Sequence, residues 1–186
     1  MKGGLHGMMR RKRINFMLPI FIGLSLLLGA CSNNNDETQP ATMENIKELV
    51  QDFSEGNIKN QSASITSQQL IVTDGDKGES AYDLPEDDFF VSIAPYVNET
   101  HPWTNHNLTG CQGELGEREF DVYIEDMEGN VILDEALTSQ TNGFIDLWLP
   151  RDKTYNITIT YDGKKVESEF STFESDGTCI TTMQLK

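Results

Sequence analysis

The chain has 186 residues, of which 30 are acidic and 14 are basic, so its formal net charge is −16. Phosphate contacts need a surface of the opposite sign, which excludes nucleic acid as a partner. The chain contains no Gly-x-Ser-x-Gly, phosphate-loop or His-Glu-x-x-His motif, so we expect that it is not an enzyme.

Residues 1–30 have the pattern of an export signal. Four consecutive basic residues at 10–13 precede an apolar run at residues 16–28, which is too short for a membrane span. Cys31 directly follows Leu-Gly-Ala, a sequence that resembles a bacterial lipoprotein box. We therefore expect an extracytoplasmic protein anchored to the bacterial cell membrane through a lipid on Cys31. The alternative is simple secretion with a stray thiol.

Without residues 1–30, the chain keeps 156 residues, nine of them basic and thirty acidic, for a formal charge of −21. This length suits one ordinary domain or two small ones. We attribute the charge first to solvation and second to attraction of metal cations. If Cys31 carries lipid, Cys111 and Cys179 remain as a pair in a compartment where disulfides persist.

The segments after the signal predict a tether and then a helix. Residues 31–41 are polar without an apolar period, which predicts a flexible tether. Thr42 is a candidate N-cap and Gly56 a candidate stop. Between them, apolar residues recur at helical spacing and predict one core-facing stripe: Ile46, Leu49, Val50 and Phe53.

Strand-like runs complete a small α+β unit over residues 42–100. They lie at residues 64–73, 82–84 and 89–94. The acidic turn at residues 74–78 lacks the glycine and glutamate positions of an EF-hand, so it predicts a hairpin turn rather than a calcium site.

Residues 101–186 predict an antiparallel β-sandwich. Several short runs alternate apolar and polar residues, and Asp162-Gly163 is the strongest hairpin signal in the chain. The last strand is expected at residues 178–185. The segment looks similar to transthyretin-like domains, a resemblance that concerns the fold alone.

A loop at the start of this segment concentrates residues of the types that bind soft metals. His101, His106 and Cys111 follow one another at five-residue intervals, which suits neither a helix face nor a strand face. They can converge only by looping, and with Cys179 they would offer thiolates and imidazoles, which select Cu(I) or zinc. The spacing leaves the metal open. A plain Cys111–Cys179 disulfide beside ordinary loop histidines is the alternative.

A resemblance to a known family favours copper. Residues 101–115 read His-Pro-x-Thr-x-His-x-Leu-Thr-x-Cys-Gln-Gly-Glu-Leu, and with residues 89–96 and 178–182 they resemble the CueP family of extracytoplasmic copper-binding proteins. The similarity extends from about Ser64 onward. It implies a Cu(I) site formed by the metal ligands Cys111, Cys179, His106 and His101. It also implies that the cysteine pair can reduce Cu(II) while forming a disulfide.

One position departs from the family pattern. The residue after His101-Pro102, usually a third cysteine in the family, is Trp103 here. This leaves a two-thiolate site completed by His106 or His101. Trp103 is either a packing residue or a cation–π partner of bound Cu(I).

The sequence therefore predicts a lipid-anchored protein for copper resistance and metal homeostasis in the cell envelope. Copper ions are its expected ligand, and it would sequester copper or pass it to a protein recipient or thiol–disulfide partner. An alternative function is adhesion or scaffolding by a surface lipoprotein whose sandwich is stapled by a Cys111–Cys179 disulfide. A third possibility is that the same pocket binds zinc.

Overall fold

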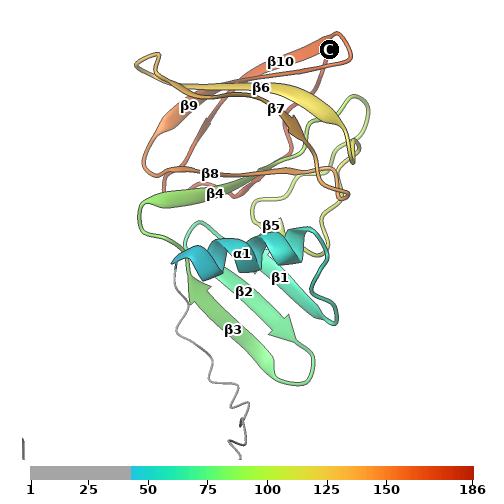
Figure 1. Cartoon of the computed structure of the whole chain (residues 1–186), viewed down its shortest axis with the longest axis vertical. Coiled ribbons are helices and arrows are strands. Elements are labelled where there is room, and N and C mark those ends of the chain that lie inside the picture. Colours follow the sequence, from blue (N-terminus) through green and yellow to red (C-terminus); the bar gives the residue numbers. More distant parts are fainter. Residues whose placement is uncertain (1–42) are drawn as a thin grey trace, which may run out of the picture. The chain divides into compact units, whose positions relative to one another are not determined.

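The computed structural model describes residues 43–186, with side chains from Asn45 onward. The predicted signal, the tether and Cys31 lie outside this part of the chain. The described residues form α1 (Met43–Ser54), β1 (Gln61–Ile65), β2 (Gln69–Asp74), β3 (Gly78–Asp83), β4 (Asp88–Ile93), β5 (His106–Asn107), β6 (Glu119–Asp126), β7 (Val131–Thr138), β8 (Ile145–Pro150), β9 (Thr154–Tyr161), β10 (Lys164–Ser171) and β11 (Cys179–Ile180) (Figure 1).

The helix α1 forms where the apolar stripe predicted it. Ile46, Val50 and Phe53 are buried, and each contributes about 1.5–3 kcal/mol by leaving water. Gly56 ends the helix with a φ of +72°, a conformation that glycine adopts without steric penalty. The candidate N-cap Thr42 lies outside the described residues. With only 12 residues, α1 is too short to cross a bilayer, and no other helix in residues 43–186 could do so.

The first sheet has the strand order β3-β2-β1-β5. The single strand predicted at residues 64–73 is wrong, because this stretch belongs to two antiparallel strands, β1 and β2. Thr66 explains the break: its hydroxyl accepts hydrogen bonds from the backbone N–H groups of Gln68 and Gln69. Such local bonds favour a turn over a continued strand. The hairpin turn predicted at residues 74–78 joins β2 to β3.

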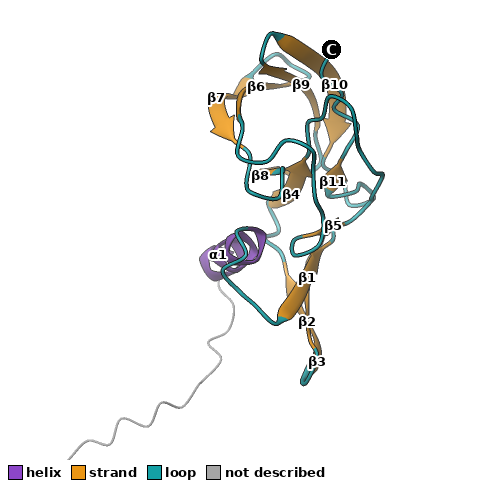
Figure 2. Ribbon diagram, turned by 90° about the vertical axis from the view of Figure 1, so that its right-hand side faces the viewer, coloured by secondary structure: helices purple, strands orange, loops and turns teal. Residues whose placement is uncertain are grey.

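The middle sheet, β11-β4-β8, is covered on both sides, and its central strand β4 is buried throughout residues 89–93. Side chains alternate across a strand, so β4 contributes to two cores. Phe89, Val91 and Ile93 pack in the sandwich core, whereas Phe90 packs in the core formed by α1, β1 and β2. Figure 2 shows α1 and the first sheet on one side of the middle sheet, and β6, β7, β9 and β10 on the other.

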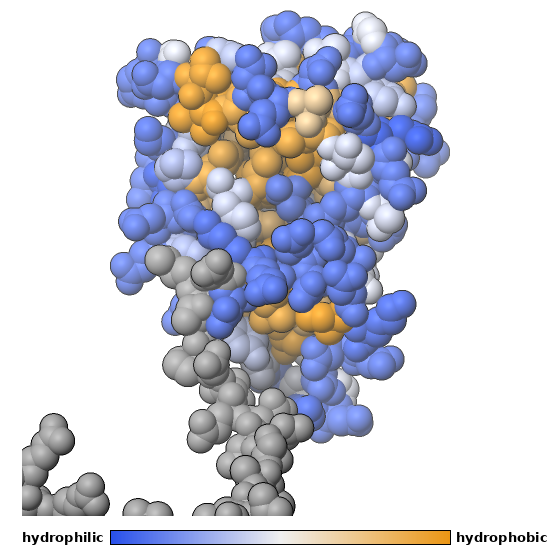
Figure 3. Space-filling model, viewed as in Figure 1, coloured by the Kyte–Doolittle hydropathy of each residue, from blue (hydrophilic) through white to orange (hydrophobic). Residues whose placement is uncertain are grey.

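The outer sheet, β10-β9-β6-β7, packs on the middle sheet to form the β-sandwich. The predicted turn at Asp162-Gly163 joins β9 to β10 with φ angles of 49° and 73°. The fold class, α+β with mostly antiparallel sheets, is confirmed, whereas the transthyretin-like arrangement stays a prediction. The face in Figure 3 is mostly hydrophilic, with apolar side chains gathered over the sandwich.

The expected division into residues 42–100 and 101–186 stays a prediction about folding units. The strand pairing crosses it in both directions: β4 pairs with β8, and β5 pairs with β1. The site described below therefore draws on elements from both segments.

The last strand is shorter than residues 178–185. The strand β11 pairs in parallel with β4 only at Cys179 and Ile180. The N–H groups of Ser92, Ala94 and Tyr96 donate to the carbonyls of Thr178, Ile180 and Met183, respectively. The donors are two residues apart each time, whereas the acceptors are two and then three residues apart. This one-residue bulge interrupts the strand.

Candidate metal centre

His106 is fixed on β5 by its backbone. It lies opposite Ile65 of β1, and its N–H donates to the hydroxyl of Thr178, 2.9 Å away. That hydroxyl donates in turn to the carbonyl of Ile65 at 2.6 Å. The imidazole is fully buried, with the ring of Phe144 4.4 Å from it between centroids. These contacts hold the ring between the first and middle sheets.

Cys111 returns to His106 through a tight turn. Its N–H donates to the carbonyl of Asn107 at 2.9 Å, and the N–H of Asn107 donates to the Cys111 sulfur at 3.4 Å. The side-chain oxygen of Asn107 also accepts from the N–H and hydroxyl of Thr109. The five-residue interval between His106 and Cys111 is thus closed by an Asn-centred turn.

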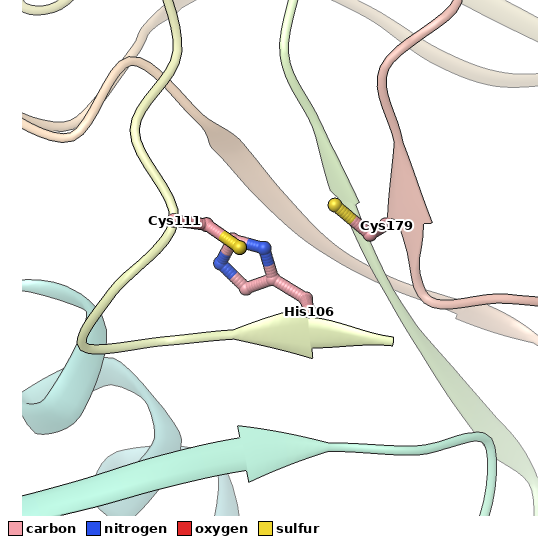
Figure 4. Close-up of side chains that lie close together, drawn as sticks. All are labelled: His106, Cys111 and Cys179. Carbon is pink, nitrogen blue, oxygen red and sulfur yellow. The ribbon is translucent and has the colours of Figure 1, made fainter. Parts of the chain in front are cut away.

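Cys179 reaches the same place from the far end of the chain. It lies on β11 opposite Ser92 of β4, and its N–H donates to the carbonyl of Thr104 at 3.1 Å. Figure 4 shows the side chains of His106, Cys111 and Cys179 pointing toward one another from β5, the following loop and β11. One donor atom from each lies within 4.8 Å of the other two.

The three side chains are almost closed to water, with exposures of 0% for His106, 4% for Cys111 and 8% for Cys179. Both cysteines are free thiols. Burial lowers the pKa of His106 to about 4, so its ring is neutral at pH 7. Burial, followed by the neighbouring Cys111 and by Asp146, raises the pKa of Cys179 to about 12, so its thiol keeps its proton.

Neither ring nitrogen of His106 has a hydrogen-bond partner in the structure. A buried polar atom without a partner is unfavourable, and such cases call for an explanation. A neutral imidazole with a free lone pair beside two thiols is the donor set that Cu(I) and zinc prefer. The residues therefore fit a soft metal ion.

The structure separates His101 from this cluster. His101 is exposed and lines a small surface cleft of about 220 Å³ together with Glu99, Gln112 and Glu114. Trp103 is 58% exposed, so it lies outside the hydrophobic core of the described residues, and its role as a packing residue stays a prediction. Its contact with bound Cu(I) stays a prediction.

Sequence reasoning missed Asp146, which stands behind the cluster. In the middle sheet Asp146 lies opposite Ser92, and Ser92 lies opposite Cys179. The Asp146 carboxylate accepts hydrogen bonds from Ser92 at 2.5 Å, Ser54 at 2.6 Å and Gln140 at 3.2 Å. Burial raises its pKa. The only signal in the sequence was a single acid within the apolar run at residues 144–149.

Comparison with known proteins shows which family the chain resembles. Residues 44–184 match the family model described as periplasmic copper-binding protein CueP. Among solved structures, the crystal structure of S.CueP is 35% identical and superposes with a TM-score of 0.71, covering 76% of this chain and 88% of that chain. The search of curated proteins found no match. The family model spans most of the chain and confirms the resemblance seen in the sequence: the protein belongs to the CueP family.

Proposed function

We propose that the protein binds copper outside the cytoplasm and holds it as Cu(I) between His106, Cys111 and Cys179. The main support is the buried group of His106, Cys111 and Cys179, here called the triad. Its three donor atoms lie within 4.8 Å of one another, and its imidazole has no hydrogen-bond partner. The family description, periplasmic copper-binding protein, supports both the metal and the location.

The donor set favours Cu(I) over structural zinc. Structural zinc sites are almost always closed by four protein ligands. Within residues 43–186, no fourth histidine, cysteine or carboxylate joins the group formed by His106, Cys111 and Cys179. Cu(I) prefers the soft thiolates that two of these three residues supply. Each thiol must release its proton to become a thiolate ligand, so binding releases protons.

The same pair of cysteines is suited to reducing copper. Two Cu(II) ions would take one electron each from the two thiols, giving two Cu(I), one disulfide and two released protons. The proximity of the two sulfurs supports this step. In an anaerobic reaction with Cu(II), we expect loss of both thiols and two Cu(I) per protein captured by a chelator. Intact thiols would show that the protein only binds copper.

The protein would act stoichiometrically rather than as an enzyme, by sequestering copper or transferring it to a recipient protein. We also propose that a lipid on Cys31 holds it at the cell membrane. Replacement of Cys31 by Ser should release the mature protein from the membrane fraction. Retention of that variant in membranes would contradict the anchor.

The function is tested by competition for Cu(I) with a chromophoric chelator under reducing conditions. The variants Cys111→Ser, Cys179→Ser and His106→Gln should each weaken affinity by about tenfold or more, since each removes one ligand. His101→Gln is the matched control, because His101 is exposed and outside the triad. Lack of Cu(I) affinity, together with a disulfide that resists mild reductant, would favour the stapled lipoprotein instead.

A further inference from the structure

The triad is closed to solvent, so an ion must displace some part of the protein to reach it. His106, Cys111 and Cys179 are each at most 8% exposed. Local opening is easiest where a segment buries little apolar surface and is held by few hydrogen bonds. Beside the triad, residues 98–105 are exposed and pair with no strand; they are here called the covering loop.

The covering loop is exposed along its whole length and ends directly before buried His106. It runs beside β11: the Thr104 carbonyl accepts from the N–H of Cys179, and the Thr100 hydroxyl donates to the Thr181 carbonyl at 2.8 Å. A Cβ atom on Gly177 would lie 2.5 Å from the Thr104 carbonyl oxygen, so the loop packs closely here. The loop is thus attached at Thr104 and near Thr100 to the segment that contains Cys179.

Near its N-terminal end, beside the Thr100 bond and the bond from the Gln184 amide to the Val97 carbonyl, the covering loop is held by the side chain of Glu114. Its Oε2 accepts hydrogen bonds from the backbone N–H groups of Val97 at 2.6 Å, Asn98 at 2.9 Å and Glu99 at 3.4 Å. Its Oε1 accepts from the Asn98 side-chain amide at 2.8 Å. These bonds favour the ionised carboxylate and lower the pKa of Glu114 to about 2.

Glu114 also links the covering loop to the turn that carries a candidate ligand. It follows Cys111 by three residues. The cleft of about 220 Å³ lies between the two segments, lined by Glu99, Thr100 and His101 from the loop and by residues 112–114 from the turn. Separation of these segments would widen this cleft next to Cys111.

We propose that Glu114 is a positioning residue that latches the covering loop over the triad and so sets how fast ions and reagents reach the two thiols. This inference deepens the proposed function and rests on it for the identity of the ion. The latch itself acts on the metal-free protein. It can therefore be tested without copper.

The test measures the alkylation rates of Cys111 and Cys179 by iodoacetamide in the reduced, metal-free protein at pH 8, read for each thiol by peptide mass spectrometry. Glu114→Gln removes the charge that three backbone N–H groups share and should raise both rates by about five- to tenfold. The control is Glu135→Gln, which removes the same charge from an exposed side chain on β7 and should leave both rates within about twofold of wild type.

A second variant loosens the loop from its other side. Thr100→Val removes the bond to Thr181 without a large change in volume and should also accelerate alkylation. Denaturation midpoints of all variants are measured in parallel. Unchanged alkylation in Glu114→Gln, whatever the result for Thr100→Val, or acceleration only in step with a falling midpoint, would overturn the latch.

The copper measurement separates the two proposals. Accelerated alkylation in a protein without Cu(I) affinity would leave the latch standing and contradict the proposed function. Normal Cu(I) affinity in the wild type, with unchanged alkylation in Glu114→Gln, would support the proposed function and contradict the latch. If both hold, Glu114→Gln should also speed Cu(I) transfer to a chelator by about the same factor as alkylation, with an equilibrium affinity close to wild type.

Discussion

A neutral, buried histidine without partners defines the site at the scale of single residues. A protonated imidazole at this position would lack both water and a hydrogen-bond acceptor, which is why burial lowers the pKa of His106 to about 4. The same burial keeps Cys179 protonated until a cation arrives. Neither the His106 ring nor the Cys179 thiol therefore carries a charge at pH 7 before metal binds.

The shifted pKa of His106 predicts how stability changes with pH. The pKa of His106 is near 6.5 in the unfolded chain and about 4 in the folded chain. Between these two pH values, the unfolded chain binds a proton at His106 and the folded chain does not. The stability present above pH 6.5 is therefore lost as the pH falls toward 4. The metal-free protein should lose about 2 kcal/mol of unfolding free energy between pH 7 and pH 5 from this group. Urea denaturation should show a smaller loss in His106→Leu, and equal losses would contradict the assignment.

Asp146 predicts a second residue-level effect. Its negative charge contributes to the raised pKa of Cys179, so Asp146→Asn should lower the pH at which the Cys179 thiolate forms. The measurement is thiolate absorbance against pH in the Cys111→Ser background, where only Cys179 reports from the pocket. An unchanged or higher midpoint would show that the charge does not act on this thiol.

Among the elements, short turns bring the candidate ligands together. The turn after β5 is closed by Asn107, and a Cβ atom on Gly113 would lie 2.8 Å from the Gly143 carbonyl oxygen. The loop after Cys111 is therefore pressed against the loop before β8. The contact between Gly113 and Gly143 joins segments that are distant in the sequence, so it cannot be predicted from local sequence signals.

Gly113→Ala should disturb this contact. The added methyl group meets backbone rather than a flexible side chain, so we expect a loss of about 1–3 kcal/mol in unfolding free energy. We also expect weaker Cu(I) binding, because Cys111 would shift. Gly75→Ala is the matched control, since nothing lies within 4 Å of its Cβ position and it should change stability by less than about 0.5 kcal/mol. Similar effects of the two substitutions would contradict the proposed packing.

The elements also show what the sequence could predict. Local signals sufficed for α1 and for the hairpin at Asp162-Gly163, because a stripe or a turn is set by neighbouring residues. The split between β1 and β2 depended on one threonine hydroxyl. The sequence proposed four candidate ligands, but it could not show that His106 is enclosed and His101 exposed, because only His106 pairs with β1 and contacts Thr178.

At the scale of the whole described unit, the metal would connect the first sheet to the middle sheet. His106 comes from the first sheet, Cys179 comes from the middle sheet, and β4 separates this site from the sandwich core. A ligand that binds only the folded chain stabilises it by mass action. Saturation with Cu(I) should therefore stabilise the whole described unit, and not only the loop that contains Cys111.

Thermal denaturation can measure this linkage. With free Cu(I) buffered at a thousandfold excess over Kd, the gain is about 4 kcal/mol, which corresponds to a rise of about 8–16 °C in Tm for a domain of this size. At the same free Cu(I) concentration, the tenfold or greater loss of affinity in Cys179→Ser should reduce this gain by about 1.4 kcal/mol or more, a Tm lower by about 3–6 °C or more. A rise of the same size in that variant would place the stabilising copper elsewhere.

X-ray absorption spectroscopy of the reduced protein loaded with one equivalent of Cu(I) can show whether the copper lies between His106, Cys111 and Cys179, because it reports the atoms bound to the metal. Copper held by His106, Cys111 and Cys179 would give a three-coordinate ion with two sulfur neighbours and one imidazole nitrogen, and would lose one sulfur neighbour in Cys111→Ser. A coordination shell of nitrogen and oxygen alone, or one unchanged by that substitution, would contradict this arrangement.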